Sequence, residues 1–590
     1  VRPGANVNPA FSQKYFAVYS QNDWRATDKL TINLGLRWDL QPGPTERFDR
    51  MSAWDLEAMN SFGTLGRIAF AGKDGYSRNL WDTQYNNWGP RIGAAYQLDP
   101  STVFRGGFGI TYLPSNTGYF SGPTDYGSAN FSSGVNQIPY GLNPNGVPVG
   151  RFSDPAPLAL AVGGNERAPQ VYGVGEARFD RHFKNGRVMQ WNFFIEKRFS
   201  STWFASVGYS ASHGDNLTNR SFPIQNLQSI SPATLAEWRE TYLATGSNPA
   251  NQQVLNPFQP ATGDLLPFSG VLGQRTIALQ NTLYPYPLLV GSAAAINQSR
   301  ATSDYQSLQL RVNHAFANGF MFDAHYTWSK EIDNTDNVED NQGFNAGGTL
   351  GNPDILNLRN NRHLGFSDIP HRFVATFLYD LPFGAGKAVE LQNSVLKAIA
   401  SGWQTGGSVI LQSGMPFAIS GASGGSVNGR PIRLDGVDIE LPKELQRWYD
   451  GSTVVTLPSG RTIRPGKNTF LKYNPDAFMG MTAIDASGRA VQDVFWWGTA
   501  APTYNDMRGP GRFNIDLSVR REFAITEQVR LEFAADATNV LNHTQLSGNY
   551  SGGLGNTNIG TTGGQSSNFG TISLNTFDPR NVVLNLRLRF

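Results

Sequence analysis

The chain of 590 residues contains no cysteine, which excludes disulfides and thiolate metal sites. Charged residues make up only 16% of it, against about 25% in an ordinary soluble domain. The net charge of +2 provides no strong field for nucleic acid or for an acidic partner. We therefore expect no nucleic-acid partner, and the low charge content argues against an ordinary soluble protein.

Long apolar runs are also missing. No stretch reaches the roughly 18 apolar residues that a spanning helix needs. The most apolar run, residues 288–296, is too short and contains glycine and serine. In a bilayer only helices and closed strand barrels satisfy every backbone group. A membrane location for this chain therefore requires β-strands.

Residues 29–40 alternate strictly between apolar and polar side chains. Apolar residues occupy every even position from Leu30 to Leu40, and polar residues such as Asn33 and Arg37 lie between them. A period of two is the signature of a β-strand. The length of about 11 residues fits a tilted strand crossing a bilayer, whereas an average globular strand has about 5 to 6.

The same alternation recurs and predicts about 13 strands. The last strand places Val582, Leu584, Leu586, Leu588 and Phe590 on one face. The others are expected near residues 15–24, 29–40, 91–98, 104–112, 191–199, 203–209, 308–316, 320–328, 373–379, 403–411, 513–523 and 529–537. Their opposite faces are polar and often charged. A soluble β-sandwich gives the same alternation. Strand length and the residues at strand ends must therefore distinguish it from a membrane barrel.

Aromatic side chains gather at both ends of the apolar faces, as in the two girdles of a membrane barrel, which lie about 25 Å apart. One end carries Trp24, Phe199, Trp203, Phe316, Phe320, Trp403 and Phe523, and the other Trp38, Tyr112 and Trp328. The fold class predicted is all-β, a transmembrane antiparallel β-barrel.

The connections between predicted strands alternate between short turns and long loops. In outer-membrane barrels the short turns are periplasmic and the long loops extracellular. The predicted long outer loops are residues 41–88, 113–186, 213–303, 331–368, 414–511 and 541–579. One connection on the short side, residues 382–402, is about 20 residues long, and residues 394–400 within it predict a small helix.

An odd number of strands is unusual for a bacterial barrel, because closing it would pair the first and last strands in parallel. The chain also begins Val1-Arg2-Pro3-Gly4, without methionine or a signal peptide. We therefore expect that a leader was removed or that earlier strands precede this chain in a longer protein.

Several segments together resemble TonB-dependent transporters, in particular the Oar-like branch, whose members carry an N-terminal carboxypeptidase-regulatory-like domain. They include YFAVYSQNDWRATDKLTINLGLRWDL (15–40), DIPHRF (368–373) and LPFGAGK (381–387). Residues 89–112, 190–198, 208–213, 305–330, 402–417 and 533–543 match as well. The resemblance covers the strands and hardly extends to the long loops.

The resemblance implies a barrel of about 22 strands around a plug. On that basis the chain is the C-terminal barrel portion, and the plug and the TonB-engaging segment are absent from it. It further implies active transport across the outer membrane of a large or scarce solute. The implied partners are outer-membrane lipid, the TonB complex through the missing N-terminal part, and an unidentified solute.

The chain ends Leu586-Arg587-Leu588-Arg589-Phe590, which resembles the signal read by the barrel-assembly machinery. Alternating apolar residues before a terminal aromatic suit recognition by strand addition. The alternative is an ordinary last strand that ends in phenylalanine and carries no signal.

Two groups of loop residues suggest ligands. Asp333, Asp336, Glu339 and Asp340 supply the oxygen ligands that Ca²⁺ prefers, although a solvated acidic loop is the favoured explanation. The loop aromatics are either a solute-binding surface or small cores that keep loops folded; they are Trp448, Tyr449, Phe495, Trp496 and Trp497.

No GxSxG elbow and no HExxH helix occurs, so we expect no enzyme, no cofactor and no catalytic metal. His363 and His371 lack convergent ligands in the sequence. Three rivals to active transport stay open at this point. They are a passive porin or surface-structural barrel, a soluble lectin-like protein, and a barrel enzyme such as a lipase or protease.

Overall fold

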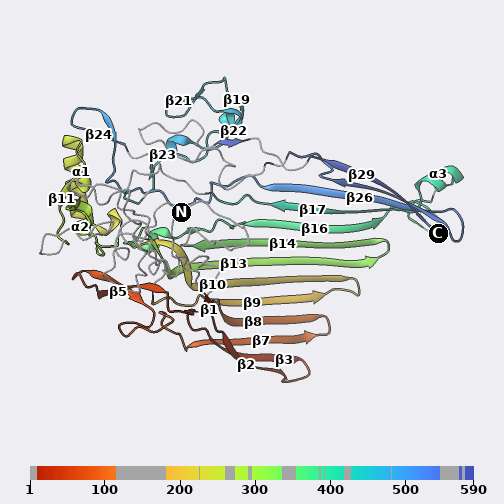
Figure 1. Ribbon diagram of the computed structural model, residues 1–590. Coiled ribbons are helices and arrows are strands. Elements are labelled where there is room, and N and C mark those ends of the chain that lie inside the picture. The colour runs from red at the N-terminus through yellow and green to blue at the C-terminus, as the bar shows by residue number, and fades with distance from the viewer. Residues whose placement is uncertain are drawn as a thin grey trace, which may run out of the picture.

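One antiparallel sheet forms the body of the molecule in the computed structural model, and folded connections gather at one end of its strands (Figure 1). The structure describes residues 10–114, 181–224, 226–258, 273–289, 295–334, 354–384, 387–390, 392–417, 427–428, 430–479, 482–544, 546, 571–573 and 579–590.

Within the described residues the sheet contains 13 consecutive strands, each paired antiparallel with the next. They are β2 (Phe16–Arg25), β3 (Leu30–Leu40), β7 (Asn87–Asp99), β8 (Thr102–Tyr112), β9 (Arg187–Arg198), β10 (Trp203–Pro223), β13 (Ala295–Ala317), β14 (Phe320–Asp333), β16 (His371–Asp380), β17 (Trp403–Gln412), β26 (Arg512–Ala524), β27 (Arg530–Thr538) and β29 (Asn581–Arg589). The short β15 (His363–Leu364) pairs with the end of β14. The predicted all-β class and the 13 strands are confirmed.

Register carries the apolar residues across the sheet on one face, called here the apolar face. Leu34 pairs with Ile92, Ile92 with Phe108, and Phe108 with Trp191. Leu34, Ile92 and Phe108 are 43%, 52% and 38% exposed, although each lies among apolar neighbours. Within the described part of the chain, no residue covers this face.

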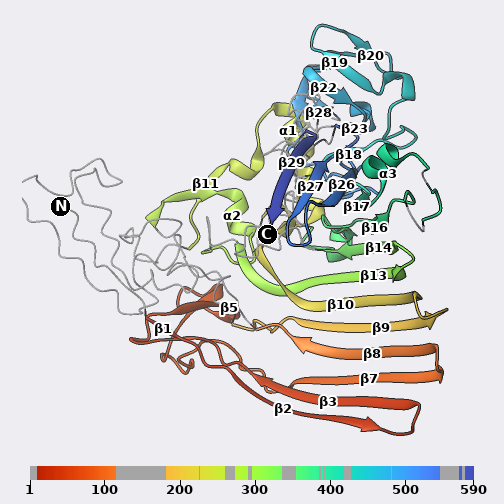
Figure 2. The same ribbon diagram turned by 90° about the vertical axis from the view of Figure 1, so that its right-hand side faces the viewer.

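Both margins of the sheet are open in the residues that the structure describes. There, β2 pairs only with β3, and β29 pairs only with β27. The sheet curves strongly from one margin to the other (Figure 2). The strands that would complete a barrel, and the count of about 22, stay predictions.

Short and long connections lie at opposite ends of the strands (Figure 1). Two residues, Asn318 and Gly319, link β13 to β14, and both have positive φ, as a tight hairpin turn requires. The long connection between β16 and β17 is the exception at the short-turn end. It contains α3 (Ser394–Ala400), which confirms the helix predicted there.

The predicted loop 213–303 is shorter in the structure, because β10 and β13 continue to Pro223 and Ala295. The ladder reaches those two residues through three irregularities between Gly214 and Phe222. In this extension apolar and polar residues do not alternate, because it lies beyond the part of the sheet that has an apolar face. The strand ends predicted from the alternation of apolar and polar residues are therefore too close to the middle of the sheet.

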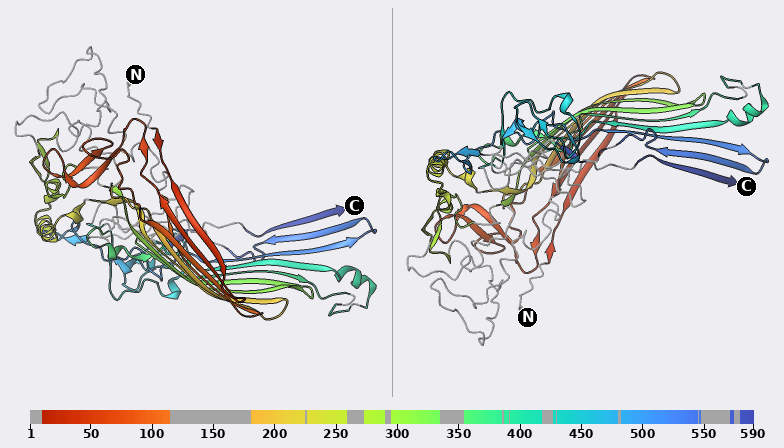
Figure 3. Two further views of the ribbon diagram at one scale, coloured as in Figure 1. Left: turned by 90° about the horizontal axis from the view of Figure 1, so that it is seen from below. Right: turned by 90° about the horizontal axis from the view of Figure 1, so that it is seen from above.

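The long connections fold into a separate layer, called here the loop layer (Figure 3). Its helices are α1 (Pro232–Thr245) and α2 (Leu279–Leu283), with 3-10 turns η3 (Leu227–Ser229), η4 (Pro249–Asn251), η7 (Leu358–Asn361), η8 (Lys443–Leu445) and η9 (Pro475–Ala477). Its small strands are β1 (Phe11–Ser12), β4 (Thr45–Glu46), β5 (Ser52–Met59), β6 (Leu65–Phe70), β11 (Gln253–Leu255), β12 (Thr276–Ala278), β18 (Ile432–Arg433), β19 (Arg447–Asp450), β20 (Val455–Thr456), β21 (Thr462–Ile463), β22 (Lys467–Leu471), β23 (Phe478–Met479), β24 (Thr482–Ile484), β25 (Ala490–Gln492) and β28 (Thr571–Ser573).

Local sequence explains the longest helix of the layer. Ser231 caps α1 by accepting a hydrogen bond from the Thr234 amide, and Pro232 occupies the first turn, where its missing N–H costs nothing. Gly246 ends the helix with a φ of 72°, a conformation that favours glycine. Within the described residues, no helix is long or apolar enough to span a bilayer.

The loop layer, not the sheet, contains the fully buried large side chains. Trp54, Tyr473 and Phe478 are each 0% exposed. One apolar cluster joins different connections, because Ile230 and Trp238 pack with Val427 and Phe495. The layer therefore has cores of the kind found in soluble proteins.

Candidate functional site

The face of the sheet opposite the apolar face is lined by paired charges. Arg311 of β13 contacts Asp323 of β14 through two bonds of 3.1 and 2.9 Å. Arg589 of β29 donates to Glu532 of β27 at 2.6 Å, and Arg105 lies 3.2 Å from Glu196. Because these side chains are partly exposed, each pair adds little stability by itself. Together they keep the face hydrophilic, as a surface in contact with water and polar solutes requires.

Ion pairs also bind the long connections to one another. Arg239 of α1 donates to Asp493 at 2.6 Å, and the Asp493 side chain is 1% exposed. The same guanidinium lies 4.8 Å from the centre of the Trp496 ring, close enough for a cation–π contact. The connection 224–294 is therefore attached to the connection 413–511 by charge as well as by the apolar cluster.

A second joint, called here the latch, is the buried pair Asp368–Arg508. The Arg508 guanidinium donates to the Asp368 carboxylate at 2.6 Å, and their side chains are 13% and 1% exposed. Arg508 also donates to the backbone carbonyls of Asp368 and Gly414, while Asp368 accepts from the Glu331 amide at 2.7 Å. The latch thus fastens connection 413–511 to the ends of β14 and β17.

Beside the latch, a buried polar cluster surrounds Asn361. Its side chain accepts from Arg430 at 2.7 Å and from the Asp354 amide at 2.7 Å. His363 places Nδ1 2.6 Å from the Asn361 carbonyl and Nε2 3.0 Å from Asp333. Burial lowers the pKa of His363 to about 4 and also lowers the pKa of Arg430. The cluster holds a neutral imidazole and serves as a structural joint.

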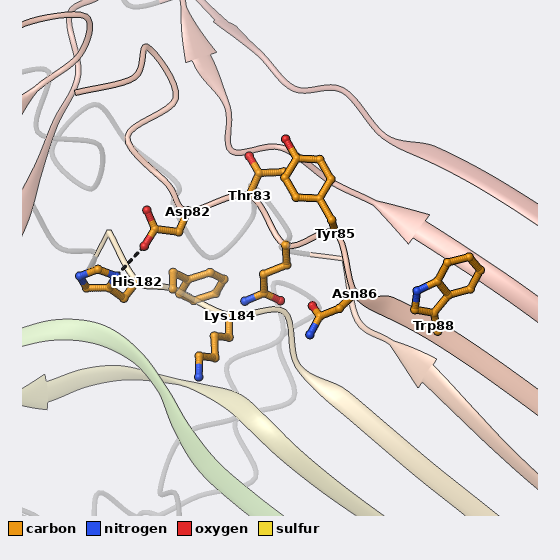
Figure 4. Close-up of a pocket in the computed structure, with 9 residues that line it drawn as sticks. Asp82, Thr83, Tyr85, Asn86, Trp88, His182 and Lys184 are labelled. Carbon is orange, nitrogen blue, oxygen red and sulfur yellow. Dashed lines mark hydrogen bonds and ion pairs between the residues drawn. The ribbon is translucent and has the colours of Figure 1, made fainter. Parts of the chain in front are cut away.

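A pocket of about 520 Å³, called here the rim pocket, lies where connection 41–86 meets residues 182–184 (Figure 4). His182 Nδ1 lies 2.6 Å from the Asp82 carboxylate. The rings of Tyr85 and Trp88, which are 68% and 51% exposed, form another part of its wall. Its size is in the range of small-molecule sites, and its lining combines aromatic surface with charge.

Arg181 connects Asp82, in the wall of the rim pocket, to Asp55 of β5. Its guanidinium lies 2.9 Å from Asp55 of β5 and 3.0 Å from Asp82. Burial alone would raise the pKa of Asp55, but hydrogen bonds from Arg181 and Tyr76 hold that pKa below its usual value. The charged arginine therefore stays paired, and the wall that carries Asp82 is held in place.

Trp88 shows where the rim pocket lies relative to the sheet. It pairs with Trp38 across β3 and β7, and their ring centres are 6.0 Å apart on the apolar face. The pocket therefore lies where the apolar face meets the loop layer. Sequence reasoning missed it because its two walls are about 100 residues apart, although the aromatic-rich stretch at residues 81–88 was a visible signal.

The predicted loop aromatics occupy different environments. Tyr449 and Phe495 are 4% and 3% exposed and belong to apolar clusters, so in this structure they act as core residues. Trp496 and Trp497 are half-buried at the joint with α1. Trp448 is 44% exposed and packs on one side against Phe470 at 5.6 Å. It is the member of the predicted set most open to a solute.

The predicted calcium ligands are only partly described. Asp333 ends β14 and is 9% exposed, next to His363. Asp336, Glu339 and Asp340 lie outside the described residues. His371, the second histidine of that region, pairs instead with the Tyr326 hydroxyl at 2.8 Å. In the described part of the chain, no three acidic or histidine side chains converge as metal ligands.

The predicted assembly signal lies on the margin strand β29. Leu586 and Leu588 are 69% and 53% exposed, and Phe590 is 97% exposed. Leu586 and Leu588 lie on the apolar face, since Leu586 pairs with Phe533 and Leu588 with Leu531, and Phe590 follows the end of β29. Among the described residues β29 pairs only with β27, so one edge of β29 has no strand partner there, next to exposed apolar side chains.

A family model described as "Outer membrane beta barrel domain" matches residues 2–582. No curated protein matches the chain. Similar solved structures include the ferripyoverdine receptor of Pseudomonas aeruginosa, at 10% identity and a TM-score of 0.33, with 98% of this chain and 39% of that chain covered.

Two further structures are similar at the same level. The ferric-catecholate import receptor Fiu from E. coli K12 is 9% identical with a TM-score of 0.35, covering 98% of this chain and 45% of that chain. The ferric citrate transporter FecA gives 9% and 0.36, with 98% and 45% covered. The chain thus spans less than half the length of these three structures.

Proposed function

Because this chain belongs to the outer-membrane β-barrel domain family, we propose that it is the barrel portion of a TonB-dependent active transporter of the Oar-like branch. The family places the chain in the cell outer membrane. The observation that carries the proposal is the division of labour in the molecule. A sheet with an apolar face that no described residue covers, and with a charged opposite face, carries a folded loop layer at one end of its strands.

The proposed mechanism assigns each part a role. The loop layer faces outside and captures a solute that is too large or too scarce for a passive pore. The charged face lines the path, and a plug inside the barrel moves when the TonB complex pulls on a segment that precedes this chain. No catalytic step is proposed for these residues, whose task is to bind, to enclose and to form the wall.

The solute site is proposed to lie in the loop layer, with Trp448 as an exposed contact. A flat ring that is partly open to solvent suits the face of a sugar or the ring of a chelating group. The solute class stays open between an oligosaccharide, a metal chelate and a peptide. Calcium at Asp333, Asp336, Glu339 and Asp340 stays a proposal, tested by whether chelation changes protease cleavage of that connection.

Energy coupling is the decisive test of this proposal. Cells that carry the full-length protein are supplied with labelled candidate solutes of the three classes, with and without TonB and with and without a protonophore. We expect saturable uptake of one class that is lost in both treatments. Uptake that continues unchanged without TonB would refute active transport.

The alternative is a passive porin or a surface-structural barrel, and conductance distinguishes it. In a planar bilayer, an open porin of this size conducts ions steadily, whereas a plugged transporter stays closed. Steady single-channel conductance of the full-length protein would favour the porin. Absence of both conductance and uptake would favour a structural role.

We also propose that Leu586, Leu588 and Phe590 are read by the barrel-assembly machinery. The variant Phe590→Ala removes the exposed terminal ring, and we expect a lower amount of protein in the outer membrane, measured by surface labelling. Arg589→Lys is the matched control, since it leaves the ring in place. Normal assembly of Phe590→Ala would contradict the proposal.

A further inference from the structure

The connection between β16 and β17 differs from the others at the short-turn end, because it carries α3 (Figure 1). Every residue of α3 except Ala400 is exposed. Val395, Leu396 and Ile399 are 62%, 56% and 62% exposed, which is unusual for large apolar side chains in water. A helix of seven residues is also too short to be stable in water without packing.

The sequence of α3 is amphipathic. Val395 and Ile399 lie four residues apart and therefore on the same side of the helix, with Leu396 next to them. Lys397 lies on the opposite side. Asn393 caps the first turn by accepting from the amides of Val395 and Leu396 at 2.9 and 3.1 Å. The helix thus has a stable start and an apolar side that no described residue covers.

The other end of α3 is attached to the sheet by two side chains. Trp403 of β17 donates from Nε1 to the Ile399 carbonyl at 2.8 Å. Arg521 of β26 donates to the carbonyls of Ala398 and Ile399, and its guanidinium lies 4.2 Å from the centre of the Phe523 ring. A cation at a helix C-terminus satisfies the last carbonyls and favours the helix dipole.

These anchors determine the side of the sheet on which α3 lies. Trp403 pairs with Arg521 in the register that pairs Val409 with Ile515, so both anchors belong to the apolar face. At the same short-turn end, that face carries the exposed aromatic residues Phe199, Trp203 and Phe316. The exposed side of α3 is therefore continuous with a surface that faces lipid in an outer-membrane barrel.

We propose that α3 is an interfacial helix of the inner leaflet of the outer membrane, with its apolar side chains among phospholipid acyl chains. The leaflet follows from the proposed orientation, in which short turns are periplasmic. Lys397 points toward the phosphate groups and water, as in other helices that lie in a membrane interface. Burial of Val395, Leu396 and Ile399 in lipid supplies the packing that the protein does not.

Residues 1–590 contain no cysteine, so within this chain a label attaches only at an introduced position, and any cysteine elsewhere in the full-length protein is first replaced by serine. The full-length protein is prepared as Val395→Cys, Ile399→Cys and Lys397→Cys, with Ile484→Cys in the loop layer as a water-exposed reference, 63% exposed in the parent. Each variant is spin-labelled in phosphatidylethanolamine and phosphatidylglycerol nanodiscs. Collision rates are then measured with oxygen, which concentrates in lipid, and with a water-soluble nickel complex.

We expect labels at positions 395 and 399 to collide more with oxygen, and labels at 397 and 484 to collide more with the nickel complex. Equal access of nickel to 395, 399 and 484 would place the helix in water and overturn the proposal. Protection of 395 and 399 from both reagents would show a protein partner on this surface and would overturn it as well.

A second measurement guards against disturbance by the label. The variant Val395→Asp with Ile399→Asp places charges on the apolar side, and Lys397→Asp is its matched control. In nanodiscs we expect faster protease cleavage within connection 381–402 for the double variant only, with the barrel still heat-modifiable on gels. Equal cleavage of the two would contradict insertion in lipid.

Discussion

The sheet and the loop layer use the same large apolar residues in opposite ways. In the sheet, Leu34 and Leu586 point outward and are 43% and 69% exposed. In the loop layer, Trp54 and Phe478 are 0% exposed. In an outer-membrane barrel the outward-facing side chains meet lipid, whereas the closed cores of the loop layer are of the kind that is stable in water. The two parts of the chain therefore suit different surroundings. Low exposure of large apolar residues identifies a core in the loop layer but not in the sheet.

Charges show the same contrast. On the sheet, pairs such as Arg311–Asp323 stay partly exposed, with side chains 45% and 25% accessible. In the loop layer, the latch pair Asp368–Arg508 is almost completely buried. A partly exposed pair contributes little, whereas a buried pair that loses one partner leaves an uncompensated charge. Loss of one partner is therefore expected to destabilise the loop layer at the latch more than the sheet at Arg311–Asp323.

Breaking the latch tests this contrast most strongly. In Asp368→Asn the buried Arg508 loses its charge partner, and we expect the loop layer to lose about 3–5 kcal/mol of unfolding free energy. Proteolysis of the layer in nanodiscs, followed against urea, measures it. Asp28→Asn is the control, since its partner Arg25 is 71% exposed. Equal sensitivity of both variants would remove the distinction between sheet and layer.

Two phenylalanine-to-alanine substitutions compare apolar side chains in the loop layer with those on the sheet. Phe478 packs 5.5 Å from Tyr504 in a closed core, so Phe478→Ala should cost the layer about 3–5 kcal/mol. The same change at Phe316, which is 52% exposed on the apolar face, leaves no closed cavity and should cost clearly less. Urea unfolding in phospholipid vesicles compares the two, and similar losses would contradict a lipid-facing Phe316.

A charge on the apolar face distinguishes lipid from water directly. Leu34 lies midway along β3, and Leu34→Lys should cost about 2–4 kcal/mol in a bilayer, as expected near the midplane. Ile484→Lys in the loop layer is the matched control, expected to change stability by less than about 0.5 kcal/mol. The measurement is folding in vesicles against urea, and a neutral Leu34→Lys would show that this face does not contact lipid.

The smallest expected effect concerns a local signal in the loop layer. Ser231→Ala removes the cap of α1 and should cost about 1 kcal/mol. Hydrogen exchange should speed up at the first-turn amides, Thr234 among them, while the strands are unchanged. Glu240→Ala, an exposed interior position of α1, is the control. Faster exchange throughout the sheet would mean that layer and sheet unfold as one unit.

Sequence patterns predicted the sheet well because its physics is local. The alternation in residues 29–40 anticipated β3 at Leu30–Leu40, and residues 394–400 anticipated α3. In both segments, residues close in sequence also share one environment. The spacing of apolar residues along the chain is therefore enough to predict the strand or helix. Where that environment ends, as in β10 beyond His213, the pattern disappeared while the strand continued.

The loop layer was hardly predictable, because its contacts join residues far apart in the chain. Phe495 was a candidate for an exposed solute contact, yet Ile230 and Trp238 cover it from a connection more than 200 residues away. The rim pocket likewise depends on His182 meeting Asp82. No periodicity signals such pairings, and a single sequence does not encode them in any visible spacing.

Each long connection leaves one strand and returns on its hydrogen-bonded neighbour, so its two ends stay about 5 Å apart whatever its length. Such closely spaced ends make a connection exchangeable between related barrels. The joint at Arg239–Asp493, however, ties connection 224–294 to connection 413–511. Those two should therefore be transplanted as a pair when specificity is redesigned, because either one grafted alone would arrive without its counterpart.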